Sequence, residues 1–266
     1  MKKKCAIIGT DARLPFLQET LDNLLDVKIF PTMIWTEELK AAINDFQPNI
    51  IFLPIPPLQI ESSFVLPESC LLLFVGKKNK QIEQEIQNSQ VHAFYYLEDE
   101  QWIWENANLT AEGFINDFYR SEKESIYNKK FIITGYGRVG KRLAFALHHL
   151  GAEVIISVRS DHQLFEAKSY GYQIEQLELA VKNQGGLSTY LINTIPNRWL
   201  SPSDTTRFKK VYDLASNPGC LLESANSIPT NYIHSTSLPG LYFPKDAGYL
   251  IAKAVQTQLA LLEGEK

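Results

Sequence analysis

The chain has 266 residues, of which 45% are apolar and 21% charged, and its formal net charge at neutral pH is -4. This composition is typical of a globular protein and excludes disordered and fibrous classes. The slight acidic balance leaves no excess of cations for a phosphate backbone, so we expect no nucleic-acid partner.

The sequence indicates neither a membrane span, nor a disulfide framework, nor a metal site. It contains no run of about 18 apolar residues, and the lysines at positions 2–4 precede too short an apolar stretch for a signal peptide. Three widely separated cysteines form no CxxC or disulfide pattern, and the five histidines show no metal-ligand spacing. We therefore expect a cytoplasmic protein without a metal ion.

Strand-like and helix-like segments alternate through the first half, which is typical of a parallel sheet covered on both faces. The predicted strands are Lys4–Ile8, Val27–Phe30, Asn49–Leu53, Leu71–Val75 and Val91–Tyr95. The predicted helices are Leu14–Leu25, Thr36–Asp45 and Asn79–Asn88.

The second half repeats this alternation. The predicted strands are Lys130–Thr134, Glu153–Val158, Tyr190–Thr194, Lys210–Leu214 and Tyr232–Ser235, and the predicted helices are Lys141–Leu150 and His162–Tyr170. The sequence thus predicts an α/β protein with two doubly wound parallel sheets.

Two further helices are predicted outside the sheets. Residues 110–128 have helical composition and are expected to bridge the domains, while residues 246–266 carry an apolar stripe and are expected to pack back at the domain junction. We therefore predict a flavodoxin-like or Rossmann-like substrate-side domain over 1–109 and a Rossmann dinucleotide-binding domain over 129–245.

A glycine-rich turn follows the first strand of the second half. Gly135 permits a tight turn, Gly137 lets a pyrophosphate approach the backbone, and Gly140 lets helix and strand pack closely. The helix then opens with Arg138 and Val139, where backbone N–H groups present partial positive charge. The pattern predicts a dinucleotide site; the alternative is a close-packed βαβ unit without a ligand.

The next strand ends in Arg159 and Ser160, where NAD sites usually carry an acidic residue for the ribose 2′-hydroxyl. A guanidinium pairs with a 2′-phosphate that a carboxylate would repel. The sequence therefore favours NADP over NAD, the alternative being a solvated surface arginine.

Several motifs together resemble the A subunits of dipicolinate synthase. They run from residue 4 to about residue 260 and are densest after Lys130. The motifs are Ala6–Arg13, Thr110–Gly113, Gly135–Gly140, Gly151–Val154, Val158–Ser160, Ile192–Pro196, Asp213–Gly219, Leu238–Gly240 and Pro244–Gly248.

The resemblance implies an enzyme of sporulating bacteria, located in the mother cell. It would oxidise a dihydrodipicolinate-level heterocycle, or its hydrated precursor, to pyridine-2,6-dicarboxylate with NADP⁺ as hydride acceptor. The resemblance also implies a partner, the flavoprotein-like B subunit of the synthase, and it leaves a homo-oligomer open.

The chain departs from the family pattern at three places. Phe74–Lys77 stands where a Ser-Gly pair is expected, Leu109 replaces a proline, and Asp246 replaces a small hydroxyl residue. These departures keep two alternatives open: another NADP-dependent dehydrogenase of the hydroxyacid type, and an NADP-binding subunit without catalysis.

Two loops are expected to line the nicotinamide pocket, since ligands in open α/β sheets bind beyond the carboxyl ends of strands. One contains Thr194, Ile195 and Pro196, and the other contains Ala215 and Ser216. The alternative is that both are simple strand-ending turns set by their prolines.

Charged residues on loops are candidates for the substrate site, expected in a cleft between the domains. Arg13 and Lys245 are candidates for binding the two carboxylates, and Lys245 alternatively pairs with Asp246. Asp11 either accepts a proton or, as we favour, caps a helix. Glu112, expected at the start of the bridging helix, is either a base or a helix-terminal charge.

Overall fold

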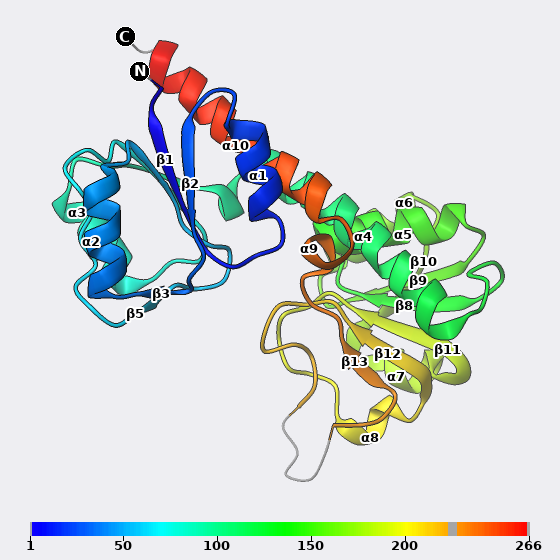
Figure 1. The fold of residues 1–266 in the computed structure, drawn as a ribbon. Helices are drawn as coiled ribbons and strands as arrows, with labels where there is room; N and C mark the ends of the chain where they lie inside the picture. The colour runs from blue at the N-terminus through cyan, green and yellow to red at the C-terminus, as the bar shows by residue number, and fades with distance from the viewer. Residues whose placement is uncertain (1, 223–227, 265–266) are drawn as a thin grey trace. The chain divides into compact units, whose positions relative to one another are not determined.

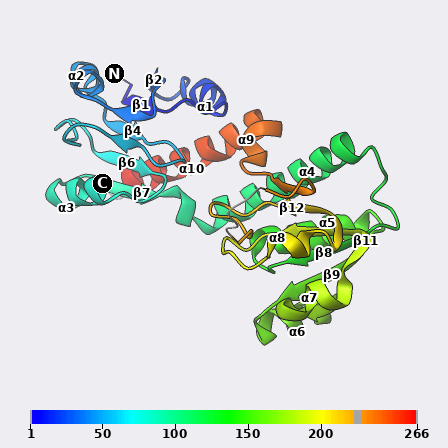
Figure 2. The same cartoon turned by 90° about the horizontal axis from the view of Figure 1, so that it is seen from below.

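The computed structural model describes residues 2–222 and 228–264, so the last two residues of the predicted terminal helix lie outside the described ranges. The chain forms two compact units. Unit 1 comprises Met1–Asn106 and Pro239–Lys266, and unit 2 comprises Ala107–Leu238. Each unit is built on its own parallel sheet (Figures 1 and 2).

The sheet of unit 1 has five parallel strands in the order β2-β1-β4-β6-β7. These strands are β1 (Lys4–Ile8), β2 (Asp26–Phe30), β4 (Ile50–Phe52), β6 (Leu72–Val75) and β7 (His92–Tyr95). Two short strands, β3 (Ile34–Trp35) and β5 (Gln59–Ile60), form a second small parallel sheet that the sequence did not predict.

Helices cover both faces of this sheet. They are α1 (Leu14–Leu21), α2 (Glu37–Phe46), α3 (Lys80–Asn88) and α10 (Pro244–Gly264). Figures 1 and 2 show α2 and α3 on one face, where Leu39, Ile43 and Ile82 join the core, and α1 and α10 on the other. Thr36 and Asn79 cap α2 and α3 by accepting backbone N–H bonds at the first turn, which fixes where both helices begin.

The long helix α4 spans Glu100–Glu122 and therefore begins at Glu100 rather than at Thr110. Its start is set by Asp99, whose Oδ1 accepts the backbone N–H of Trp102 at 2.7 Å. Just before it, the 3₁₀ turn η1 (Tyr96–Glu98) buries Tyr96 between Phe52 and Trp102.

The sheet of unit 2 has six parallel strands in the order β10-β9-β8-β11-β12-β13. The strands are β8 (Lys130–Thr134), β9 (Glu153–Val158), β10 (Gln173–Gln176), β11 (Gly186–Asn193), β12 (Phe208–Asp213) and β13 (Tyr232–His234). The predicted α/β class with two parallel sheets is thus confirmed.

Figure 1 shows α4, α5 and α6 on one face of this second sheet and α7 and α8 on the other. Their bounds are α5 (Arg138–His149), α6 (Asp161–Ser169), α7 (Leu177–Gln184) and α8 (Pro202–Thr205), and the short α9 (Leu238–Tyr242) follows β13. Phe114 and Phe118 of α4 are fully buried against Phe131 and Tyr212, so the second half of α4 supplies core to unit 2. No helix within the described residues is long and apolar enough to cross a membrane.

Candidate functional site

The strand register brings the predicted cofactor-binding segments to one edge of the unit 2 sheet. Thr134 at the end of β8 pairs with Ser157 of β9 and with Asn193 of β11, and Asn193 pairs with Asp213 of β12. Because the strands are parallel, the segments that follow them leave from the same edge. They are Gly135–Gly140, Arg159–Ser160, Thr194–Pro196 and Ala215–Ser216.

The glycine turn connects β8 to α5 at the point where the strand order reverses, between β8 and β11. Gly135 has φ +92°, and a Cβ there would lie 2.4 Å from Thr194 Oγ1. A Cβ on Gly140 would lie 2.2 Å from the Gly135 carbonyl oxygen. Both positions therefore exclude larger side chains because of the fold itself.

Gly137 differs from its two neighbours, because a Cβ built on it meets nothing within 4 Å. It is exposed and forms the N-cap of α5, yet no side chain accepts a hydrogen bond there. Backbone N–H groups at such a helix start suit an anion. A glycine that the protein's own packing does not require, at an uncapped helix start, fits a phosphate-binding cradle.

The two residues that open this helix are Arg138 and Val139, the first exposed and the second half-buried. Next to the turn, Tyr136 is buried and packs edge-on against Tyr172. Burial raises the pKa of the Tyr136 hydroxyl above its ordinary value.

Arg159 and Ser160 directly follow β9, and both are exposed. The Arg159 Nε lies 3.3 Å from Glu178 Oε1 on α7, and Ser160 is the N-cap residue of α6 without a side-chain capping bond. Gln176, the last residue of β10, pairs with Val158, the last of β9, so Arg159 and the start of α7 leave the same edge side by side. Sequence reasoning missed Glu178 because it did not predict β10 or α7.

The segment after β11 is held by its own polar groups. The backbone N–H of Thr194 and its hydroxyl both donate to the Thr134 carbonyl oxygen at 2.9 Å. Ile195 is half-buried and Pro196 exposed. The Thr194 side chain therefore ties the loop to β8 beside the glycine turn.

A buried polar pair at the ends of β11 and β12 was not among the predicted site residues. Asn193 Nδ2 donates to Asp213 Oδ1 at 2.7 Å, and both side chains are fully buried. The Asn193 amide oxygen accepts from Thr134 Oγ1 and from the indole N–H of Trp199, while its amide nitrogen also donates to the Ile195 carbonyl. This pair fixes the loop after β11.

Asp213 also organises the loop after β12. Its carboxylate accepts the backbone N–H groups of Ala215 and Cys220 and the hydroxyl of Tyr232. The Ala215 carbonyl contacts His234 Nε2 at 2.8 Å, whereas Ser216 is exposed. The sequence motifs contained Asn193 and Asp213, but polar residues at strand ends gave no sign that they pair with each other.

In unit 1, Asp11 and Arg13 lie in the turn that joins β1 to α1. Arg13 is 6% exposed, and its Nε and Nη2 both donate to the Asp11 carboxylate, which also accepts the Arg13 backbone N–H at 2.9 Å. The forked contact predicted for a substrate carboxylate is made by Asp11 in this structure. Since Arg13 itself occupies the N-cap position, Asp11 organises the turn from two residues before the cap.

Burial raises the pKa of Asp11, but the bonds and charge of Arg13 outweigh this effect and leave the pKa below its ordinary value. A carboxylate that holds its negative charge so firmly is a weak proton acceptor. The geometry thus favours Asp11 as the partner of Arg13 over Asp11 as a base.

Two glycines of the last predicted motifs pack onto Arg13. A Cβ on Gly240 would lie 3.2 Å from Arg13 Nε, and one on Gly248 would lie 2.7 Å from the Arg13 carbonyl oxygen. Lys245 lies in the same first turns of α10 as Gly248, is exposed, and places its Nζ 5.6 Å from the centre of the Tyr249 ring. The structure therefore brings Asp11, Arg13 and the start of α10 together within unit 1.

Glu112 and Asp246 do not occupy the helix ends expected from the sequence. Glu112 is exposed in the interior of α4, well after its first turn, and it belongs to unit 2. Asp246 lies inside the first turn of α10, which begins at Pro244. The expected terminal position of Glu112 is wrong because Asp99 starts the helix earlier.

The departure at Phe74–Lys77 falls at the carboxyl end of β6. A Cβ on Gly76 would lie 2.1 Å from the Pro54 carbonyl oxygen and 2.8 Å from the hydroxyl of Tyr96, which donates to the Leu53 carbonyl. Gly76 therefore permits a close approach of the chain here.

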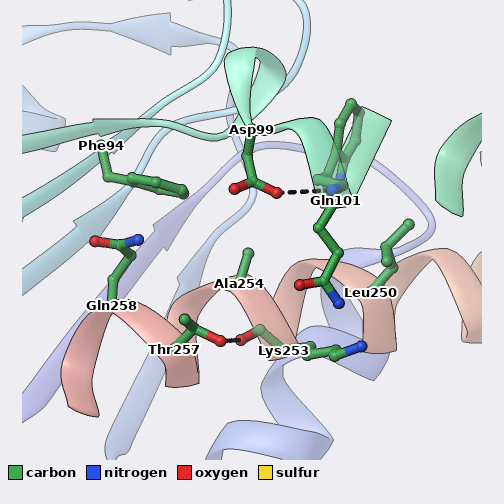
Figure 3. A pocket seen from close by; sticks show the side chains of 9 residues that line it. Phe94, Asp99, Gln101, Leu250, Lys253, Ala254, Thr257 and Gln258 are labelled. Atoms are coloured by element: carbon green, nitrogen blue, oxygen red, sulfur yellow. Dashed lines mark hydrogen bonds between the residues drawn. The ribbon is translucent and has the colours of Figure 1, made fainter. Parts of the chain in front are cut away.

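A separate hollow in unit 1 lies between the start of α4 and α10 (Figure 3). Its volume is only about 30 Å³, and its dashed contacts join Asp99 to the chain at Trp102 and Thr257 to the Lys253 carbonyl. None of the predicted site residues is among the described residues that line it. The described ranges likewise hold no cluster of three or more metal-ligating side chains.

No family model matches the sequence. The chain is 27% identical over 294 aligned positions to the A subunit of dipicolinate synthase from Bacillus subtilis, covering 99% of this chain and 98% of that protein. The predicted resemblance is therefore found along the whole chain.

Solved structures show the same fold. The A subunit of the Bacillus subtilis dipicolinate synthase superposes with a TM-score of 0.79 at 22% identity, covering 100% of this chain and 98% of that one. Its counterpart from Bacillus halodurans gives 0.77 at 22% identity, over 97% and 98%. D-lactate dehydrogenase from Escherichia coli gives 0.63 at 11% identity, over 99% and 98%, so the fold is dehydrogenase-like.

The sequence motifs, the two parallel sheets and the full-length identity agree. The chain is similar over its whole length to the A subunits of dipicolinate synthase, which confirms the resemblance.

Proposed function

We propose that this chain is the A component of a dipicolinate synthase, which oxidises a dihydrodipicolinate-level heterocycle or its hydrated precursor to pyridine-2,6-dicarboxylate. The observation that carries the proposal is its similarity, over 99% of the chain, to a protein of that name. The open, uncapped cradle at Gly137 independently supports a phosphate-bearing cofactor.

The cofactor in this proposal is NADP⁺, which when bound accepts a hydride from the ring. Backbone N–H groups at the start of α5 bind its diphosphate, with Gly135, Gly137, Arg138, Val139 and Gly140 forming the turn. Arg159, with Ser160 beside it, binds the 2′-phosphate, because no carboxylate follows β9 directly. Asn193 and Asp213 hold the loops of Thr194–Pro196 and Ala215–Ser216 in place for the nicotinamide end.

Aromatisation of the ring releases one proton in addition to the hydride. Arg13 and Lys245 bind the two carboxylates of the substrate, and Arg13 keeps N–H groups beyond the two that Asp11 receives. Asp11 anchors Arg13, and Glu112 is the remaining candidate for the proton acceptor. The proposal also includes a cytoplasmic B subunit partner in a sporulating cell, as the name of the relative suggests.

The test is a steady-state assay of NADPH formation with freshly generated pathway intermediate, with and without the B subunit. Mass spectrometry then identifies pyridine-2,6-dicarboxylate as the product. We expect turnover that increases with the partner. Arg13→Lys keeps the charge but removes the planar fork, so it is expected to raise KM more than it lowers kcat. Tight nucleotide binding without product, with and without the partner, would refute the enzymatic proposal.

A further inference from the structure

A hollow of about 360 Å³ lies in unit 2 at the edge of the sheet where β9 and β10 end. Arg159 and Glu178 both line it, together with Trp199, Asp204 and Arg207. The hollow is therefore bounded by the residue proposed to select NADP and by an acidic residue from a different helix.

Arg159 and Glu178 form an exposed ion pair across this hollow. The Arg159 Nε lies 3.3 Å from Glu178 Oε1, and the two side chains are 59% and 63% exposed. Such pairs are weak, because water screens the charges and two long side chains must be ordered. A ligand with greater charge can displace the carboxylate at little cost.

A 2′-phosphate carries more negative charge than a carboxylate and more acceptor oxygens for the guanidinium fork. Glu178 occupies the group that such a phosphate would use, and it adds a like charge beside it. An adenosine ribose without a 2′-phosphate does not compete with Glu178 in this way.

Building on the proposed function, we infer that Glu178 is a specificity-determining residue that competes with the cofactor 2′-phosphate for Arg159 and thereby limits the preference for NADP over NAD. The residue acts through Arg159 and does not take part in hydride transfer. Selectivity is set by the difference between two affinities, which a competing group can lower without touching the chemistry.

The test is calorimetric titration of the full chain with NADP⁺ and NAD⁺. Glu178→Gln is expected to tighten NADP⁺ binding about fivefold and to change NAD⁺ binding less than about twofold, since a unit charge several ångströms away acts with roughly that strength near water. In an Arg159→Gln background the same substitution is expected to leave NADP⁺ binding nearly unchanged, because the competition has no object.

Glu153→Gln is the matched control. Glu153 is an exposed glutamate at the opposite end of β9, where it pairs with Lys130 at 3.9 Å, and we expect no change in either affinity. Equal NADP⁺ affinity of the wild type and Glu178→Gln, or equal tightening in the Arg159→Gln background, would overturn the inference while nucleotide binding stands. Binding of neither nucleotide to the wild-type chain would overturn the proposed cofactor and the inference together.

Discussion

Asn193 and Asp213 join neighbouring strands through one buried hydrogen bond, with Asn193 Nδ2 2.7 Å from Asp213 Oδ1. From this bond the network extends to Ile195 and Trp199 on one side and to Ala215, Cys220 and Tyr232 on the other. Two loops that leave different strands are thus held by a single pair of side chains.

Replacement of this carboxylate is expected to destabilise the protein. Asp213→Asn removes the negative charge and places an amide N–H₂ where two donors already point, so we expect a loss of about 2–3 kcal/mol in the free energy of unfolding. Urea unfolding followed by circular dichroism measures it. Asp26→Asn, at an exposed position in β2, is the control and should unfold like the wild type; equal stability of both variants would contradict a supporting role for the network.

The two glycines of the turn are expected to respond differently to alanine. Gly140→Ala forces a Cβ against the Gly135 carbonyl and should cost about 2 kcal/mol of stability. Gly137→Ala meets no protein atom and should cost about 1 kcal/mol or less, yet it fills the cradle and should weaken NADP⁺ binding at least about tenfold. Unfolding curves and calorimetry separate the effects, and normal nucleotide affinity of Gly137→Ala would argue against a phosphate at this turn.

A carboxylate cluster near the end of α4 is expected to make stability depend on pH. Hydrogen bonds from Lys129 and Lys209 lower the pKa of Glu124 to about 2, and nearby Glu122, despite burial that would raise its pKa, is lowered by Lys210 and Tyr212. Because the pKa of Glu124 is lower in the folded state, its contribution is present above about pH 4.5 and lost as the pH falls toward about 2.

The measurement is urea unfolding at about pH 7 and about pH 3 for wild type and Glu124→Gln. The wild type should lose more stability on acidification than the variant does. Glu19→Gln, an exposed substitution on α1, should keep the wild-type pH dependence. Parallel curves for wild type and Glu124→Gln would contradict the assignment.

The thiols are expected to be inert in the native protein. All three cysteines are buried and free, and burial raises the pKa of Cys5 and Cys70 to about 12 and that of Cys220 as well. Thiolates, the reactive form, are therefore scarce at neutral pH. Titration with a chromogenic disulfide should label no thiol until denaturant is added and then label all three; rapid labelling in buffer would contradict this burial.

The strands of both sheets could be predicted because they are apolar on both faces. β8 and β9 lie at the centre of their sheet, and their fully buried runs of Phe, Ile and Val coincide with the predicted ranges. β10 could not be predicted in this way, since an edge strand with the sequence Gln-Ile-Glu-Gln contains one apolar residue. Glu178 was missed for the same reason.

The glycine turn was found from its spacing, whereas the residues that support it were not. The positions of Gly135 and Gly140 carry a local signal, because close approach requires glycine wherever the pattern occurs. Asn193 and Asp213 are separated by a helix and a loop in the sequence, and only the pairing of β11 with β12 makes them neighbours. Similarly, the start of α4 depends on one hydrogen bond from Asp99, which the helical composition after Thr110 conceals.

Unit 1 is assembled from both ends of the chain, since α10 packs against α1 through the close approach of Gly248 to Arg13. During translation the amino-terminal strands leave the ribosome long before the helix that covers α1. All of unit 2 is synthesised in the interval, so it can mature while its predecessor still waits for its final covering element.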